Sequence, residues 1–324
     1  MSKNFKICLI VASSLLVFGA LIFVITMSAL KWDFKKLSTV KYETKEYEMT
    51  EDFKNILINT DTSRIVFLPS EDETIKVVSY EQKKLHHEVS VFDNTLKIEL
   101  NDTRKWYEHI TLFSFDSPQI TVYLPKKAYG ALNIASHTGD IEIPKDFTFK
   151  SIDIGASTAD INCLASATDL IKIHVSTGDI DVSGVFSKSI DLSASTGAIK
   201  LSGSIFTGDV KIKASTGNVS IRDVMCNAIF ASGSTSNIKL TNAIAAEKID
   251  ITTSTGDIAL DLSDGGEISL KASTGNITGT LLKNKEFDAK ASTGHVSTPP
   301  SVMGAGKCVI RTSTGNIRIS VVEK

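Results

Sequence analysis

The amino-acid sequence predicts an all-β chain: a parallel β-solenoid (β-helix) of about ten 19–21-residue coils, preceded by an N-terminal transmembrane helix. Three observations lead to this fold class. A motif based on Ser-Thr-Gly recurs in ten copies at intervals of 19 to 21 residues. Apolar and polar residues alternate on both sides of each motif, which is typical of strands with one buried face. An uncharged, mostly apolar stretch of 24 residues, 7–30, lies near the N-terminus.

The apolar stretch 7–30 is long enough to cross a bilayer, which takes about 20 residues. It is also longer than the apolar part of a secretory signal, and Trp32 directly after it suits the membrane interface. More lysines follow the stretch than precede it, which by itself would keep the large domain in the cytoplasm. Because the short tail 1–6 is a poor segment to translocate, we expect an uncleaved signal-anchor in the cell membrane, with the C-terminal domain extracytoplasmic. The alternative is a signal peptide cleaved near Ala29.

Residues 31–52 are expected to form a juxtamembrane linker, and residues 53–130 a β cap that starts the solenoid. Segments such as "TIKVVSY" and "QITVYLP" alternate in polarity and are joined by charged turns. The stretch from Thr60 to Phe67, "TDTSRIVF", is similar to a degenerate coil of the later series. The regular solenoid repeats then occupy residues 131–322.

Each repeat is expected to hold two short strands joined by a tight turn. Ile212 and Ala214 precede one motif, and Val219 and Ile221 follow it, all at alternate positions. Gly suits the turn because it adopts positive φ without steric cost. The Asp or Asn that usually follows can hydrogen-bond its own turn backbone. The motif glycines are Gly139, Gly178, Gly197, Gly217, Gly256, Gly275, Gly294 and Gly315, with Ala159 and Ser236 in place of Gly in the other two repeats.

The same alternation is compatible with an antiparallel meander in which Thr-Gly closes hairpins. The nearly constant period favours the solenoid, because the perimeter of a coil fixes its length whereas a hairpin loop can vary. The predicted pairing is therefore parallel, with Ile212 beside Leu192 and Ala231. The rest of each period often carries an apolar pair that we expect to fill a third side of the coil: Val185-Phe186, Ile205-Phe206, Val224-Met225 and Leu281-Leu282.

Charge and composition argue against several function classes. The formal net charge is −2 with both signs interspersed, so we expect no nucleic acid as a partner. The six histidines show no metal-ligand spacing, and His86-His87 is expected in a solvated turn. No His and carboxylate recur beside the motif, so we expect no catalytic residues, no cofactor and no enzyme. A polysaccharide-acting β-helix enzyme is the least favoured alternative, because spacings of 19–21 leave no insertions to build a groove.

One column of carboxylates could still bind a cation. Asp140, Asp160 and Asp179 follow the Gly position in three successive repeats, and neighbouring strands lie about 4.7–4.9 Å apart. Carboxylates at that spacing can share Ca²⁺, but the column continues as Ala198 and Asn218. We expect these side chains to cap turns, and the sequence leaves Ca²⁺ binding open.

A hydrophobic N-terminal stretch, an "ITVYLPK" strand from Ile120 to Lys126, the segment "LNIASHTGDIEI" and serial "STGDI" and "STGNI" units occur in this order. Together they resemble the DUF4097 family, whose members are catalogued as "putative adhesin" proteins. The resemblance extends over residues 53–322. It implies a parallel β-solenoid on a bacterial envelope protein, and it implies no catalytic residues because the family supplies none.

The predicted function is that of a non-catalytic, membrane-anchored interaction module of the bacterial cell envelope, adhesin-like, with a protein or cell-envelope partner that the sequence does not identify. The alternative is a membrane-tethered structural scaffold that polymerises end to end. The last repeat, Cys308 to Val322, has no later coil to cover it. Its strand edge, with Arg311, Arg318 and Ser320, is therefore the candidate surface for self-association or for another envelope protein.

Overall fold

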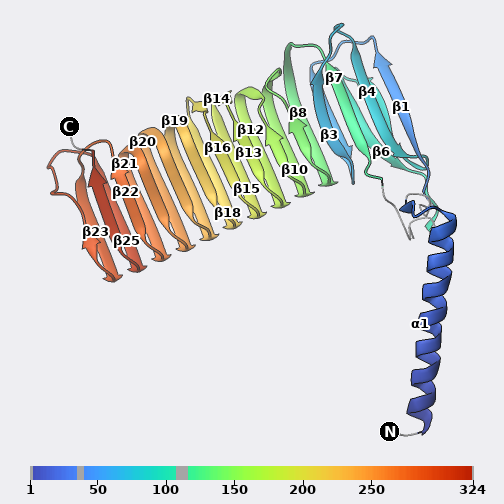
Figure 1. Ribbon diagram of the computed structural model, residues 1–324. Helices are drawn as coiled ribbons and strands as arrows, with labels where there is room; N and C mark the ends of the chain where they lie inside the picture. The colour runs from blue at the N-terminus through green and yellow to red at the C-terminus, as the bar shows by residue number, and fades with distance from the viewer. Residues whose placement is uncertain (1–2, 35–39, 107–115, 323–324) are drawn as a thin grey trace.

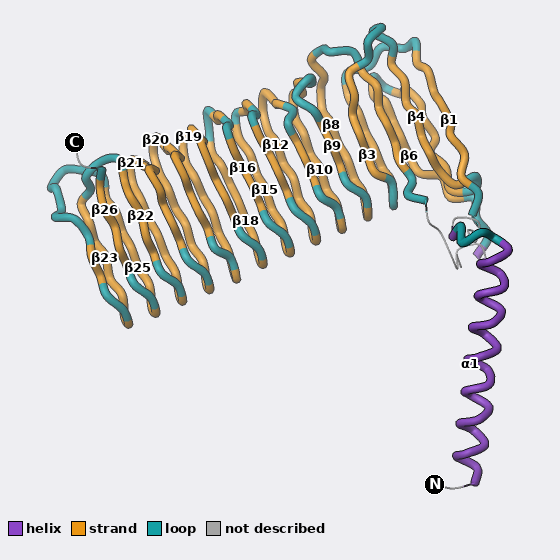
Figure 2. Tube along the Cα trace, viewed as in Figure 1, coloured by secondary structure: helices purple, strands orange, loops and turns teal. Residues whose placement is uncertain are grey.

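The chain forms a long β-solenoid with a β cap at one end and a separate helix (Figure 1). This computed structural model describes residues 3–34, 40–106 and 116–322. Of the lysines that follow the apolar stretch, Lys35 and Lys36 lie outside the described residues. Figure 2 shows that the described part of the chain after the helix consists of strands joined by short loops.

Helix α1 (Lys3–Ala29) is apolar along most of its length and lies outside the β body. Its most apolar window has a mean hydropathy of 2.8, and none of that window is buried inside the protein. The helix has 27 residues, which at a rise of 1.5 Å per residue span about 40 Å, whereas the hydrocarbon layer of a bilayer is about 30 Å thick. By length and composition, α1 can therefore serve as a membrane span or as a signal sequence.

Seven strands precede the regular coils: β1 (Tyr42–Met49), β2 (Asn55–Thr60), β3 (Arg64–Pro69), β4 (Ile75–Gln82), β5 (Leu85–Phe92), β6 (Thr95–Asp102) and β7 (Gln119–Leu124). β2 and β3 pair in parallel with β8 (Ala128–Thr138) and β9 (Ile141–Ile143), so they make the first coil. β6 and β7 lie on its far side, also in parallel. β5, β4 and β1 then add antiparallel strands that close this end of the solenoid.

The coils after β8 and β9 have three sides. The first side, before the motif Gly, holds β10 (Thr148–Thr158), β12 (Ser166–Thr177), β15 (Ser189–Thr196) and β18 (Asp209–Thr216). The second side, after the Gly, holds β11 (Ile161–Cys163), β13 (Ile180–Ser183) and β16 (Ile199–Ser202), and the third side holds β14 (Phe186–Ser187) and β17 (Ile205–Phe206). β19 (Val219–Thr235), β20 (Ile238–Thr255) and β21 (Ile258–Thr274) run without a break over all three sides.

Neighbouring coils pair in parallel and in register. Ile212 pairs with Leu192 on one side and with Ala231 on the other, as predicted from the constant period. All three side chains point inward and are at most 3% exposed. The inward columns form one continuous core, from Phe53 in the cap to Ile319. Because each buried aliphatic side chain contributes roughly 1.5–3 kcal/mol, stacking supplies the stability that a single coil lacks, and the parallel solenoid is confirmed.

The Thr-Gly turn requires glycine for two independent reasons. The motif glycines have φ between +124° and +152°, a region that side chains rarely adopt. A Cβ built on Gly217 would also lie 2.0 Å from the carbonyl oxygen of Gly197 on the neighbouring coil. At Ala159 and Ser236 the backbone is not in the positive-φ region, so these two departures from the motif reflect a different local backbone rather than a tolerant turn.

The Asp or Asn after the motif Gly bonds to the next coil, and not to its own turn as the sequence suggested. Oδ1 of Asp140 accepts a hydrogen bond from the backbone N–H of Asp160 at 3.0 Å, and Oδ1 of Asp160 accepts one from Asp179 at 2.7 Å. The same bond joins Asn276 to Asn316 at 2.9 Å. At the described turns, the N–H of the Asp or Asn does not donate to a backbone carbonyl of the neighbouring coil. The side-chain oxygen of the stacked Asp or Asn accepts its hydrogen bond instead.

A second column of left-handed residues turns the chain from the second side to the third. Gly184, Gly203, Asp223, Asn242 and Leu262 recur at intervals of 19 or 20 residues, with φ between +49° and +66°. Nδ2 of Asn242 donates a hydrogen bond to Oδ1 of Asp223 at 2.7 Å. This corner column was not foreseen from the sequence.

The last coils are stacked out of chain order. The strands are β22 (Ile277–Leu281), β23 (Glu286–Thr293), β24 (Val296–Ser297), β25 (Lys307–Thr314) and β26 (Ile317–Val321). β25 lies between β21 and β23, and β26 lies between β22 and β24. The expectation that Cys308 to Val322 forms the open end is therefore wrong.

The apolar content of the two last coils accounts for this order. The C-terminal coil carries Ile310 and Ile317, which are fully buried between neighbours on both sides. β23 and β24 offer the smaller Ala289 and Val296 at the equivalent positions, and these are only partly buried. Placing the larger aliphatic side chains one coil further in removes more apolar surface from water.

Candidate interaction surfaces

The predicted edge residues do not share a free strand edge. Arg311 pairs with Lys271 on one side and Lys290 on the other, and its guanidinium donates hydrogen bonds to the carboxylate and the backbone carbonyl of Asp288. Arg318 on β26 pairs with strands on both sides.

Ser320 lies beyond the end of β24, so β26 is paired there only with β22. Arg311, Arg318 and Ser320 thus lie on two consecutive strands of the same coil, β25 and β26. Arg311 and Arg318 are one coil inside the end of the solenoid.

The true ends of the solenoid are unsuited to strand addition. The outermost strand β23 carries Glu286, Asp288 and Lys290, and Pro299-Pro300 follow β24. At the opposite end, β1 pairs only with β4 and reads "YETKEYEM". Charged residues and prolines on edge strands oppose pairing with a further chain. Both ends therefore disfavour the alternative of end-to-end polymerisation.

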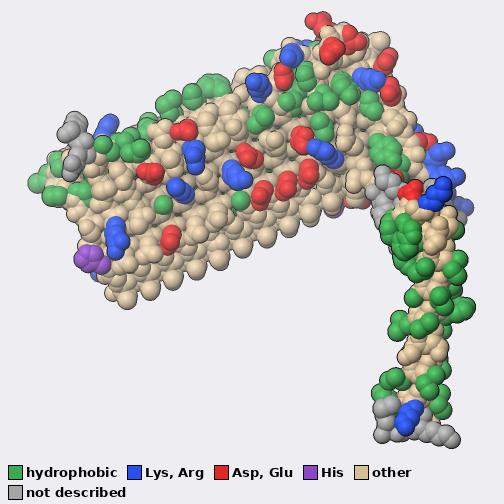
Figure 3. All heavy atoms as spheres, viewed as in Figure 1, with side chains coloured by type: hydrophobic (Ala, Val, Ile, Leu, Met, Phe, Trp, Pro, Cys, Tyr) green, Lys and Arg blue, Asp and Glu red, His purple; other side chains and the backbone are tan. Residues whose placement is uncertain are grey.

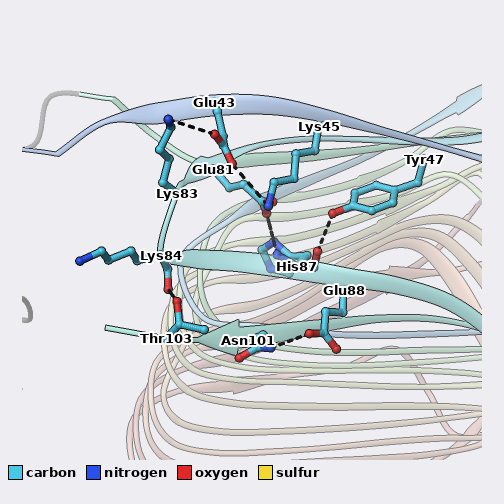
Figure 4. Close-up of polar contacts among 10 residues, drawn as sticks. All are labelled: Glu43, Lys45, Tyr47, Glu81, Lys83, Lys84, His87, Glu88, Asn101 and Thr103. Carbon is cyan, nitrogen blue, oxygen red and sulfur yellow. Dashed lines mark hydrogen bonds and ion pairs between the residues drawn. The ribbon is translucent and has the colours of Figure 1, made fainter. Parts of the chain in front are cut away.

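A hydroxyl, an imidazole and a carboxylate are linked inside the cap. Oγ1 of Thr60 lies 2.8 Å from Nε2 of His87. Nδ1 of His87 lies 2.7 Å from Oε2 of Glu81 (Figure 4). The hydroxyl of Tyr47 donates to the carbonyl of His87 at 2.9 Å. The three linked side chains come from β2, β5 and β4 and are at most 3% exposed. The expectation of a solvated His86-His87 turn is wrong for His87, because alternation along β5 points it inward with Leu85.

This buried network is structural. Burial acts to raise the pKa of Glu81, but hydrogen bonds from the ring and backbone of His87, with the charges of His87 and Lys45, together hold it below its usual value. Oε1 of Glu81 has no hydrogen-bond partner among the described residues, and Nζ of Lys45 lies 3.6 Å away. The adjoining cavity is about 10 Å³, room for one water at most. The network thus joins β2, β4 and β5 of the cap.

A groove of about 640 Å³ lies where the cap meets the first turns of the solenoid, beside Ser117 and Pro118. Asp140 and Asp160 line it, and each uses Oδ1 to accept the N–H of the following coil. Among the residues that the structure describes, no three His, Cys, Asp or Glu side chains are grouped to hold a metal ion. The carboxylate column of Asp140, Asp160 and Asp179 thus serves the stacking of coils.

An exposed column of apolar side chains runs along the third side of the solenoid (Figure 3). Phe186, Ile205 and Met225 are 51%, 45% and 52% exposed. They pair with one another on successive coils, and Met225 pairs with the half-buried Ile244. We call these four residues the apolar stripe.

The apolar stripe was missed by the sequence reasoning, which placed both members of each apolar pair inside the coil. Val185 and Val224 are buried, but the residues after them, Phe186 and Met225, point outward. In the pair Ile205-Phe206 the order is reversed, and Phe206 is buried. Successive side chains of an extended strand point to opposite faces, so each pair must leave one member in solvent.

Solved structures with similarity to this chain include two described as "putative adhesin". One, from Bacteroides fragilis NCTC 9343, is 18% identical, with 86% of this chain and 97% of that chain covered and a TM-score of 0.43. The other, from Parabacteroides distasonis ATCC 8503, is 15% identical, with 87% and 98% covered and a TM-score of 0.41. A "putative lipid binding protein" from the same Parabacteroides strain is 14% identical, with 87% and 98% covered and a TM-score of 0.30.

No protein with a curated description matches the sequence. The profile of the family described as Toastrack DUF4097 matches residues 53–213 and 203–324, which together cover every coil and the strands of the cap from β2 onward. The motif glycines, the stacked Asp and Asn side chains and the parallel coils all fall within this match. The chain belongs to the Toastrack DUF4097 family.

Proposed function

We propose that this protein is a membrane-anchored, non-enzymatic interaction module of the bacterial cell envelope, which binds another protein through the apolar stripe. The observation that carries the proposal is the exposure of Phe186, Ile205 and Met225, each about half exposed, in one continuous column. Contiguous exposed apolar surface is rare on monomeric soluble proteins and typically marks an interaction site. The parallel coils hold this column rigid, so little conformational entropy is lost when it is covered.

Binding rather than catalysis is supported by the chemistry of the described residues. The hydroxyl–imidazole–carboxylate arrangement of Thr60, His87 and Glu81 is closed to substrates. The thiols of Cys163 and Cys308 are fully buried, and burial raises the pKa of each to about 12. Thiols that stay protonated are poor nucleophiles. The scaffold alternative is not proposed, because the edges of β1 and β23 are charged.

The proposal places α1 in the membrane and the β body on the extracytoplasmic side. An exposed apolar helix either lies in lipid or is cleaved from the mature protein. The length of α1 favours a membrane span over a cleaved signal peptide. Protease treatment of intact cells tests this placement. Digestion of the β body outside the cell agrees with it, whereas protection until the cells are lysed contradicts it.

The interaction role is tested by photo-cross-linking of the full chain on cells. A photoreactive residue at Ile205 lies within the stripe, and one at Lys200, exposed on the second side, is the matched control. We expect a discrete protein adduct from position 205 and none from position 200. Adducts of equal yield and size at both positions, or no adduct from either, would contradict the proposal.

A further inference from the structure

We infer that the partner covering the apolar stripe is a second copy of this chain, packed antiparallel across a twofold axis. This inference rests on the proposed interaction role and goes beyond it by naming the partner. It is carried by the distribution of charge along one flank of the stripe, which makes the surface complementary to itself in one orientation only.

The charged flank runs beside the stripe over four coils. One flank residue lies on each of the four coils that carry a stripe residue. In coil order these flank residues are Lys188, Thr207, Asn227 and Glu247. Backbone bonds agree with this order, since the N–H of Thr207 donates to the carbonyl of Ser187 and the N–H of Asn227 donates to the carbonyl of Gly208. The amide of Asn227 also donates to Oε2 of Glu247 at 3.1 Å. Lys188 and Glu247 are both exposed, so the flank is positive at one end and negative at the other.

Antiparallel face-to-face packing reverses the order of the coils. With the axis between the coils of Ile205 and Met225, the side chain of Ile205 lies over Met225 of the second copy. The same operation lays Phe186 over Ile244 of the second copy. All four stripe residues are covered in this arrangement, as expected of a self-complementary twofold interface.

The same axis brings opposite charges together. Lys188 of each copy faces Glu247 of the other, so two ion pairs form at the rim. Packing with the coils in the same order would need a rotation about the solenoid axis, which lays this flank over the corner column of the other copy. Neither ion pair forms in that orientation, so the charges favour the antiparallel one. The charge pattern therefore specifies the antiparallel arrangement.

The other flank leaves space for the second copy. It is the corner column, in which Gly184 lies beside Phe186 and Gly203 beside Ile205. A Cβ built on Gly184 would meet nothing within 4 Å, and one on Gly203 would meet an atom only at 3.9 Å. The antiparallel arrangement places Asn242 over Gly184 and Asp223 over Gly203, with no like charges opposed. The longer polar side chains thus face glycines.

The predicted contact is small and depends on the membrane. Three intervals between coils span about 14 Å, so the stripe and its flanks fall short of the roughly 800 Å² per partner of a stable free dimer. Anchoring both copies by α1 in one membrane raises their effective concentration. We therefore expect self-association in a bilayer and much weaker association in dilute detergent.

Energy transfer between donor- and acceptor-labelled full chains in the same lipid vesicles tests the inference. Lys188→Glu and Glu247→Lys each place like charges at both rim contacts, and we expect each to lower the apparent association constant about fivefold. The double variant Lys188→Glu with Glu247→Lys restores opposite charges and should recover association. Lys200→Glu, which makes the same charge reversal on the second side, should not change the association. Melting temperatures confirm that these exposed substitutions leave the fold intact.

The outcomes separate this inference from the proposed function. If either single variant associates like the natural chain, or if the double variant does not recover, the antiparallel dimer is overturned. If position 205 cross-links to a different protein and no energy transfer occurs, the second copy is the wrong partner but the interaction role stands. If position 205 gives no adduct and no energy transfer occurs, both proposals fall.

Discussion

Gly233 and Ser236 occupy complementary positions within one coil. A Cβ built on Gly233 would lie 2.7 Å from the Cβ of Ser236, whereas several other coils carry Ala at the first position and Gly at the second. Ser236 adds a side chain to the turn, and the absence of a side chain at Gly233 leaves room for it. This departure from the repeat is compensated locally, within three residues.

The pair predicts a double-mutant cycle. Gly233→Ala alone should destabilise the β body by about 1–3 kcal/mol, because the added methyl overlaps the side chain of Ser236. Combining it with Ser236→Gly removes the overlap, so the double variant should be more stable than Gly233→Ala. Denaturant unfolding of both single variants and the double variant measures the coupling. Strictly additive effects would show that the two positions are independent.

Substitution of a motif glycine should be severe for any side chain. At Gly217, φ is +134° and a Cβ would lie 2.0 Å from a neighbouring carbonyl oxygen. Although Asn tolerates φ near +57°, it gains nothing at +134°, so Gly217→Asn and Gly217→Val should both cost about 3 kcal/mol or more. Gly184→Asn is the control, since φ is +66° and the space is open. Equal unfolding midpoints for Gly217→Asn and Gly184→Asn would contradict this account.

Leu262 offers a stabilising substitution. It has a φ of +49° and is 44% exposed at the end of the corner column. A bulky side chain in the left-handed region costs about 1 kcal/mol or more, which Asn or Gly avoids. We expect Leu262→Asn to raise the melting temperature. Leu282→Asn, at a residue 38% exposed and without positive φ, should not. An equal rise in melting temperature at both positions would show that the gain comes from the loss of exposed apolar surface and not from the left-handed backbone of Leu262.

The cap should lose stability in acid through Glu81. Because the pKa of Glu81 is lower in the folded chain than its ordinary value of 4.5, its ionised form contributes stability above that value. This contribution is lost as the pH falls below about 4.5 through the folded pKa. Glu81→Gln should melt at a lower temperature than the natural chain at pH 7 and depend less on pH between 5 and 3. Parallel pH profiles for the two proteins would rule out this role of Glu81.

The sequence was sufficient to predict the coil, and the reason is visible at Ile212. Its neighbours Leu192 and Ala231 follow from a constant period and from alternation alone. The corner column was accessible in the same way, because Gly184, Gly203 and Asp223 recur with that period. The signal for this corner was the recurrence, once per coil, of residues that permit a left-handed backbone.

The order of the last coils could not be predicted from the repeat. Equivalent residues such as Gly275, Gly294 and Gly315 can stack on one another in any order, because each presents the same turn and the same ladder of backbone groups. The burial of Ile310 and Ile317, compared with that of Ala289 and Val296, distinguishes the two arrangements. The inward position of His87 was missed for a different reason, since its hydrogen-bond partners lie on other strands.

The out-of-order stacking makes the stability of the far end depend on completion of the chain. Among the described residues, β23 pairs with β25 and β24 pairs with β26, so residues 286–297 lack their native partners until residues 307–321 have been synthesised. A chain that lacks residues 307–321 must either restack β23 and β24 on β21 and β22 or leave the apolar side chains of β21 and β22 open to water. Residues 307–321 thus determine whether the solenoid reaches its native end.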